Sequence, residues 1–216
     1  MSIDADHLAT RLTAAISTGS APHGDGVGWL WPVLLRQLAR GRPVAVDDLA
    51  QATGRSAVEV RDALAGLSDT EYDEQGRVVG HGITLRPTPH QFTVDGHRLY
   101  TWCALDTLIF PVVLDRPAQV VSPTPGSGEP VRLDVDPAAG VVALEPATAV
   151  VSVVVPDACG SVRSAFCNQV HFFASPSAAQ EWQTEHPGAE VLPVAEAFGL
   201  GRRLAQNLLG DEASCC

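Results

Sequence analysis

Cys103 and Asp106 lie three residues apart in the apolar segment YTWCALDTLIFP, which runs from Tyr100 to Pro111. On a helix this spacing places both side chains on one face, one turn apart. A carboxyl group among apolar neighbours must find a partner, stay protonated or face a cavity. Because desolvation raises its pKa, Asp106 could accept the proton of the Cys103 thiol and later donate it near neutral pH.

Other roles are open to both residues. A lone helical cysteine is often a small buried hydrophobic residue. An aspartate before a threonine often caps a helix, but Pro111 leaves too little room for a helix that starts at Thr107. We therefore expect a helix that begins at Arg98 and is limited by Pro111, with Cys103 and Asp106 on it.

Cys167 is the second candidate thiol, in the segment SAFCNQVHFF. Phe166, Val170 and Phe172 predict an apolar environment, and taken alone Cys167 would also be a core residue. If Cys167 and Cys103 meet in space, two thiolates beside a carboxylic acid would suit a soft, thiophilic metal rather than Mg²⁺ or Ca²⁺. With only two thiolates available, that metal would be two-coordinate.

A cysteine hydrolase is an alternative that needs a Cys–His pair oriented by Asn or Asp. His97, His171 and Asn168 keep it open, although we expect His171 to be a structural residue of an alternating strand. The sequence contains no GxGxxG, P-loop, HExxH or GxSxG pattern.

The remaining three cysteines are Cys159, Cys215 and Cys216. Cys159 follows Asp157 and precedes Gly160, which predicts a loop residue without an assigned role. Cys215 and Cys216 follow a polar GDEAS segment and are either part of an exposed tail that oxidises easily or a pair that captures or hands over a metal ion.

Composition limits the classes of partner. The 216 residues carry 14 basic side chains, all arginine, against 25 acidic ones, a net charge of −11 that repels nucleic acid and anionic membranes. The N-terminus has Asp4 and Asp6 and does not resemble a signal peptide, and no apolar run approaches the ~20 residues of a membrane span. An odd number of irregularly spaced cysteines indicates reduced thiols in the cytoplasm.

The first part of the chain predicts a winged-helix arrangement. A short helical lead and a Gly-rich linker precede a helix over 29–40, and two short helices follow in 44–67, the second capped by Ser56 with Glu59. A hairpin with a Gln75–Gly76 turn completes the module. Such modules often bind DNA. The helix that would read DNA, however, has one arginine against two acidic residues, a net charge of −1 that disfavours contact with phosphates. We therefore favour the alternative that the module is a helical cap packed on the second half of the chain.

The second part is richer in strands. Short β-branched segments separated by Pro, Gly and Asp turns predict an antiparallel sheet, namely HQFTVDG, AQVVS, PVRLDV, GVVALEP and AVVSVVVP. We expect a helical turn at GSVRSAFCNQ, a strand at VHFFAS, a helix from Ser175–Pro176 to Pro187–Gly188 and a last helix over about 194–209. The predicted fold is α+β: a winged-helix-like module (1–86), a mainly antiparallel sheet with flanking helices (87–210) and a tail (211–216).

Three segments, RLYTWCALDTLIFP, SVRSAFCNQVHFFAS and EAFGLG, occur in this order, and through them the chain resembles the organomercurial lyase (alkylmercury lyase) family of bacterial mercury resistance. The resemblance covers nearly the whole sequence. It implies protonolysis of a carbon–mercury bond, R–Hg⁺ giving R–H and Hg²⁺, without an organic cofactor. Cys103 and Cys167 would be the thiolates that bind mercury, and Asp106 would take a thiol proton and deliver it to carbon.

The same resemblance implies a pocket for the organic group, for which Trp102 and Phe166 are candidates beside a plain packing role. It also implies a cytoplasmic setting, small-molecule thiols that help to release Hg²⁺, and a mercuric reductase as the next enzyme. The alternative from another class is a metal-responsive winged-helix regulator that reads DNA and senses metal through its cysteines. The acidic charge and the Cys–Asp spacing argue against it.

Overall fold

The computed structural model describes residues 8–10, 12–13, 28–155 and 162–210. Most of the predicted Gly-rich linker, Cys159 and the pair Cys215–Cys216 therefore lie outside the described residues. No helix in the described part of the chain is long and apolar enough to cross a membrane.

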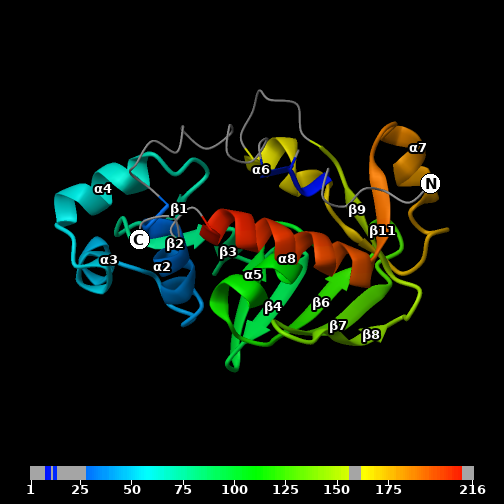
Figure 1. Ribbon diagram of the computed structural model, residues 1–216, viewed down its shortest axis with the longest axis horizontal. Coiled ribbons are helices and arrows are strands. Elements are labelled where there is room, and N and C mark those ends of the chain that lie inside the picture. Colours follow the sequence, from blue (N-terminus) through cyan, green and yellow to red (C-terminus); the bar gives the residue numbers. More distant parts are fainter. Residues whose placement is uncertain (1–7, 11, 14–27, 156–161, 211–216) are drawn as a thin grey trace.

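The winged-helix prediction is confirmed. Three helices and a two-stranded hairpin stand at one end of the molecule (Figure 1). Ser56 caps α4, since its hydroxyl accepts the Glu59 backbone N–H and the Glu59 carboxylate accepts the Ser56 N–H. The elements are α2 (Leu30–Leu38), α3 (Val46–Thr53), α4 (Ala57–Ala65), β1 (Glu71–Tyr72) and β2 (Val78–His81).

An antiparallel sheet of eight strands continues from this hairpin into the second half, in the order β1-β2-β3-β5-β4-β6-β7-β8. Its further strands are β3 (Ile83–Thr84), β4 (His90–Val94), β5 (His97–Thr101), β6 (Ala118–Pro123), β7 (Pro130–Asp136) and β8 (Gly140–Glu145). The α+β class is thereby confirmed, while the proposed division at residue 86 stays a prediction because the same sheet runs across it.

A smaller antiparallel sheet, ordered β10-β9-β11, lies at the other end of the molecule (Figure 1). The remaining elements are β9 (Val150–Val153), α6 (Val162–Ala165), the 3₁₀ turn η1 (Cys167–Gln169), β10 (Phe172–Phe173), α7 (Gln180–Glu185), β11 (Glu190–Pro193) and α8 (Val194–Gly210). The predicted helix from Ser175 begins only at Gln180, because residues before it form turns.

The predicted helix from Arg98 is wrong. Asp95 and Gly96 both have positive φ, 50° and 79°, and so form a tight hairpin turn that returns the chain as strand β5 against β4. The helix that follows is α5 (Asp106–Leu114). Cys103 therefore lies in the turn before this helix, and Asp106 is the first residue of the helix. The prediction that the two side chains share one helical face is wrong.

Pro111 does not limit α5, although the sequence prediction gave it that role. Proline removes one backbone N–H donor at a cost of about 3 kcal/mol. Against this, α5 buries Leu108, Ile109 and Phe110 among other side chains, and each such burial contributes about 1.5–3 kcal/mol. Packing therefore outweighs the local penalty, and the helix continues to Leu114.

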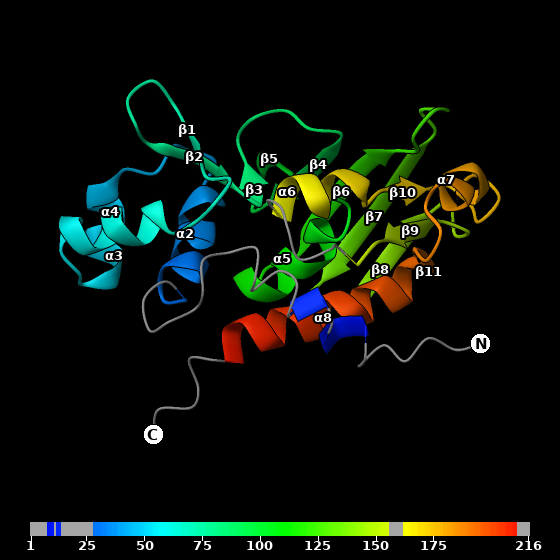
Figure 2. The ribbon, with the colours of Figure 1, turned by 90° about the horizontal axis from the view of Figure 1, so that it is seen from above.

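Helix α5 is held between the sheet and α8, as Figure 2 shows. Gly201 of the EAFGLG region allows the two helices to approach closely, since a Cβ at this position would lie 3.2 Å from Ile109 Cγ1. A buried helix with neighbours on both faces is a rigid support, and α5 carries Asp106 at its first position.

Candidate active site

Cys103 is fully buried and its backbone is fixed on both sides. The Trp102 N–H donates to the Gly82 carbonyl at 3.0 Å, and the Thr101 hydroxyl donates to the Cys103 carbonyl at 2.9 Å. The next residue, Ala104, donates its N–H to the Val170 carbonyl at 3.1 Å. This last bond joins the segment of Cys103 directly to the segment that follows Cys167.

Asp106 is 9% exposed and its Oδ2 accepts the Cys103 backbone N–H at 3.2 Å. Burial raises the pKa of Asp106 to about 7, although hydrogen bonds from Cys103 and from the Trp102 backbone act in the opposite direction. Near neutral pH this carboxyl group can therefore both accept and donate a proton.

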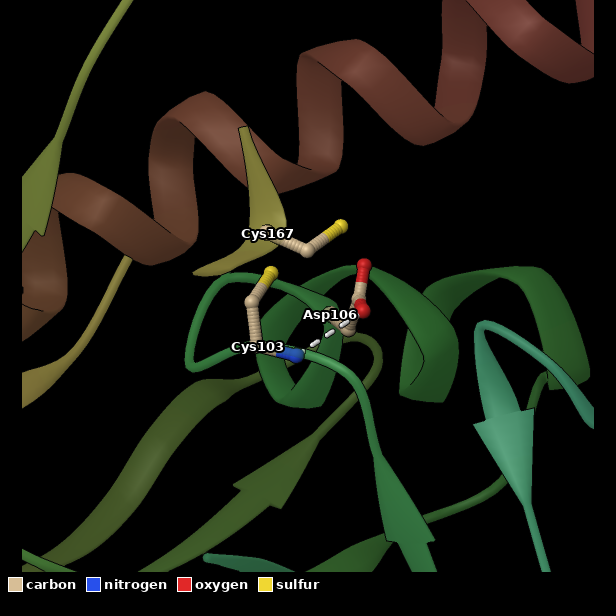
Figure 3. Close-up of side chains that lie close together, drawn as sticks. All are labelled: Cys103, Asp106 and Cys167. Carbon is tan, nitrogen blue, oxygen red and sulfur yellow. Dashed lines mark hydrogen bonds between the residues drawn. The ribbon is translucent and has the colours of Figure 1, made fainter. Parts of the chain in front are cut away.

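Cys167 is 4% exposed and begins the 3₁₀ turn η1, whose closing bond runs from the Val170 N–H to the Cys167 carbonyl at 3.2 Å. The short turn directs the side chain toward the start of α5. Figure 3 shows the sulfur atoms of Cys103 and Cys167 and the carboxyl group of Asp106 facing one another.

The three side chains form one compact cluster. A sulfur or carboxylate oxygen of each lies within 4.8 Å of the others, all three residues are buried, and both cysteines are free thiols. Two sulfur donors and one oxygen are a ligand set for a soft metal ion. The structure thus brings together the three residues that the sequence singled out for chemistry.

Both thiols resist ionisation in this environment. Burial, with contributions from Cys167 and Asp106, raises the pKa of the Cys103 thiol well above its ordinary value. For Cys167, a hydrogen bond with Cys103 lowers the pKa, but burial and the Asp106 charge outweigh it, so that the pKa is raised. A metal that binds these sulfurs must therefore displace protons, and Asp106 is the nearest acceptor.

The cysteine hydrolase alternative loses its support. In the ranges that the structure describes, the ligating cluster contains no histidine. His171 stacks on His90 with ring centroids 6.3 Å apart, and His97 is exposed on β5. His171 is thus a packing residue, as predicted, but it lies directly before β10 (Phe172–Phe173) rather than in the strand.

The two residues predicted to form a pocket, Trp102 and Phe166, are both buried beside the cysteines that follow them. The Trp102 indole donates to Glu71 Oε1 at 3.1 Å, so its polar edge points away from solvent. Contact of either ring with an organic group stays a prediction.

Arg163 was not identified from the sequence, although it lies one helical turn before Cys167. Its guanidinium lowers the pKa of the Cys167 thiol, a smaller effect than those of the Cys103 hydrogen bond, burial and Asp106. The one signal was its i−4 spacing from Cys167, which sequence alone cannot distinguish from a surface arginine.

Comparisons with known proteins identify the family of the chain. Residues 83–206 match the family model described as alkylmercury lyase, and residues 5–82 match the helix-turn-helix domain of alkylmercury lyase. The fold resembles the solved structure of the mercury-bound form of MerB2, with a TM-score of 0.78 and 23% identity, covering 92% of this chain and 99% of that one.

Curated relatives extend over the whole chain. An alkylmercury lyase of Streptomyces lividans is 58% identical over 218 residues, covering 100% of both chains. That of Bacillus cereus is 48% identical, covering 100% of this chain and 99% of its own, and that of Pseudomonas putida is 47% identical, covering 97% of each. With this identity over its full length, the chain belongs to the alkylmercury lyase family.

Proposed function

We propose that this alkylmercury lyase cleaves carbon–mercury bonds by protonolysis with Cys103 and Cys167 as the two mercury ligands and Asp106 as the proton carrier. The observation that carries the proposal is the buried cluster of two free thiols and one carboxyl group within 4.8 Å. Its substrates are organomercurial small molecules, and mercury is substrate and product rather than a resident cofactor.

The reaction balances with a substrate that arrives on a small-molecule thiol as R–Hg–SR′. One cysteine thiol replaces R′S on mercury, giving R–Hg–S–Cys and releasing R′SH. The second thiol then binds mercury while its proton passes to the Asp106 carboxylate. Asp106 donates that proton to carbon, the carbon–mercury bond breaks, and R–H leaves behind a mercury ion held by both sulfurs.

The electrostatics of the cluster suit this sequence of steps. Two sulfur donors push electron density onto mercury and weaken its bond to carbon. With a pKa of about 7, Asp106 can carry the proton near neutral pH, whereas a carboxyl group at its ordinary pKa of 3.8 would be almost fully ionised and would have no proton to donate. Removal of the thiol protons is favoured only when mercury binds, because burial raises the pKa of Cys103.

The remaining steps are part of the same proposal. Trp102 and Phe166 would receive the alkyl or aryl group, and no organic cofactor would take part. Two further molecules of R′SH would exchange onto mercury, restore both cysteine thiols and carry Hg²⁺ away, and Cys215 and Cys216 would be the pair that hands the ion over. We place the reaction in the cytoplasm, upstream of a mercuric reductase.

We further propose that the winged-helix module does not bind nucleic acid. Helix α4 (Ala57–Ala65) carries Arg61 against Glu59 and Asp62, so its charge opposes contact with phosphates. The metal-responsive regulator, the alternative from another class, would require salt-dependent binding to duplex DNA, which a titration at two ionic strengths measures.

The deciding experiment is headspace gas chromatography of the purified protein with phenylmercury and excess thiol, beside Asp106→Ala and Cys167→Ser. We expect benzene from the wild type, a loss of about 10²–10⁴-fold in rate from Asp106→Ala, and none from Cys167→Ser. Tight mercury binding without benzene from the wild type would indicate a site that holds metal without cleaving. Full activity in Cys167→Ser would contradict the two-thiolate mechanism.

A further inference from the structure

Glu71, in strand β1 of the hairpin, is a second buried carboxylate, 8% exposed and outside the thiol cluster. Its Oε1 accepts the Trp102 indole N–H at 3.1 Å and forms an ion pair with the Arg163 guanidinium, and its Oε2 accepts the Thr84 hydroxyl at 2.6 Å. The Glu71 carboxylate thus accepts contacts from three donors that belong to three separate segments.

Two of these donors belong to the segments that carry the reactive thiols. Trp102 immediately precedes Cys103, and Arg163 in α6 lies four residues before Cys167. The two partners also contact each other, since the Arg163 guanidinium carbon lies 4.8 Å from the centroid of the Trp102 ring. The Arg163 backbone N–H donates to Asp69 Oδ2 at 3.4 Å, a further contact with the residues that lead into β1.

The sequence of the hairpin leaves space for this carboxylate. Gly80 pairs with Glu71 across β1 and β2, and a Cβ at position 80 would lie 2.6 Å from Glu71 Oε2. The backbone of Gly80 does not have the positive φ that favours glycine, so the requirement is one of space. A side chain here would displace the carboxylate from its three donors.

Stability alone explains this arrangement poorly. Only the Glu71 side of this ion pair is buried, since the Arg163 side chain is 36% exposed. The desolvation of the buried carboxylate offsets much of the attraction, and solvent screens the exposed side, so the pair adds little net stability. What such a pair does provide is a fixed geometry between the elements it joins. Here those elements are the hairpin, the turn before α5 and the turn α6–η1.

The second fixed point between the thiol segments is the backbone bond from Ala104 to the Val170 carbonyl. The η1 turn is also held after Cys167, where the Ser152 hydroxyl donates to the Gln169 carbonyl at 3.0 Å and His186 Nε2 lies 3.0 Å from Gln169 Oε1. All these contacts follow Cys167 in the chain. The ion pair of Glu71 with Arg163 acts on the other side of Cys167, and the Trp102 indole ties the same carboxylate to the segment of Cys103.

We propose that Glu71 is a positioning residue of the active site, which through Trp102 and Arg163 fixes the placement of the Cys167 thiol relative to Cys103. The N-terminal module thereby contributes to the site with a residue that touches neither substrate nor reacting atoms. This inference rests on the proposed function for its kinetic test and on mercury binding alone for its second test.

The test compares Glu71→Gln, Arg163→Gln and the double variant with a control, Asp73→Asn. Glu71→Gln keeps the shape of the side chain but removes the charge that pairs with Arg163. Asp73 forms an ion pair with Arg77 at 2.7 Å toward the tip of the same hairpin, so its variant controls for loss of a hairpin charge. Arg163→Lys, at a partly exposed side chain, serves as a further variant should Glu71→Gln not fold.

We expect kcat of Glu71→Gln to fall about 10- to 100-fold with KM little changed, because a misplacement of about 1 Å has an effect of this size. Asp73→Asn should keep the wild-type kcat. In the Arg163→Gln background Glu71→Gln should have little further effect, since the glutamine oxygen can still accept the Trp102 indole N–H and both substitutions remove the same ion pair. Arg163→Lys should retain part of the kcat that Arg163→Gln loses.

Mercury retention provides a readout without turnover. Protein loaded with Hg²⁺ is dialysed against increasing dithiol, and the bound metal is measured by mass spectrometry. Linear binding by two sulfurs depends on their mutual placement, so Glu71→Gln should release Hg²⁺ at about tenfold lower dithiol than the wild type. Cys167→Ser gives the one-thiol limit.

Wild-type kcat and mercury retention in a folded Glu71→Gln protein would overturn the inference, as would effects of Glu71→Gln and Arg163→Gln that multiply in the double variant. A wild type that binds Hg²⁺ through both thiols but releases no benzene would refute the proposed function instead. Mercury retention would then still decide whether Glu71 positions the thiols.

Discussion

Two buried carboxyl groups, Asp106 and Glu71, lie within the same core but are supplied with very different partners. Glu71 has a guanidinium, an indole N–H and a hydroxyl. Asp106 accepts a backbone N–H and lies beside two thiols, and within the described ranges it forms no ion pair. The difference teaches that a carboxyl with a full set of donors fixes geometry, whereas one without a cation can exchange a proton.

The pKa of Asp106 has a consequence for stability. A group whose native pKa of about 7 exceeds its unfolded value of 3.8 contributes stability that is fully present below 3.8 and lost as the pH rises through 7. Asp106→Asn removes this dependence. We therefore expect the free energy of unfolding of Asp106→Asn, relative to wild type, to increase by about 4 kcal/mol between pH 3.5 and pH 8.

Urea unfolding at several pH values measures this difference. Burial also lowers the pKa of His81 to about 4 and of His90 to about 3, which makes both proteins lose stability as the pH falls below about 6.5. Since both proteins share these histidines, the subtraction isolates Asp106. A difference that stays constant with pH would show that Asp106 is not the perturbed group and would remove the contrast with Glu71.

The pH profile of turnover sharpens the same contrast. If Asp106 must be ionised to accept a thiol proton, kcat/KM should rise about tenfold per pH unit below about 7 and level off above it. Small-molecule thiols ionise near pH 8.5, so an inflection near 7 belongs to the protein. Initial rates of benzene release with phenylmercury at saturating thiol give the profile.

Asp106→Ala is the control for this profile, because its residual rate should lack the inflection near pH 7. A wild-type kcat/KM that instead falls through pH 7 would mean that Asp106 enters the reaction already protonated. The thiol proton would then need another acceptor, and the carrier role of Asp106 would be wrong.

The sequence predicted the chemistry of the site better than the elements that hold it. Cys103, Asp106 and Cys167 could be chosen because thiols and a carboxyl in apolar segments are conspicuous locally, and one motif holds the first two. The start of the helix was misplaced because the Asp95–Gly96 turn returns the chain as strand β5, and its end was misplaced because the burial of α5 outweighs the penalty of Pro111.

No local pattern in the sequence predicts the contacts of Glu71. Glu71 lies 31 residues from Trp102 and 92 residues from Arg163, so no periodicity or spacing rule connects them. A glutamate in a short hairpin strand predicts an exposed side chain, since strands alternate and charged residues are mostly exposed. The Glu71 side chain is buried and meets its donors only because the fold brings α6 against the hairpin.

Gly80→Ala separates the position of the Glu71 carboxylate from its charge. The added methyl group would lie 2.6 Å from Glu71 Oε2 and 2.7 Å from Thr84 Oγ1, so both side chains must move. We expect a loss of about 1–3 kcal/mol in the free energy of unfolding, measured by denaturant, together with a lower kcat. Gly199→Ala in α8, where a Cβ meets nothing within 4 Å, should lose no stability. If Gly80→Ala kept full stability and full kcat, the carboxylate could shift without consequence, and Glu71 would be no more fixed than Asp106.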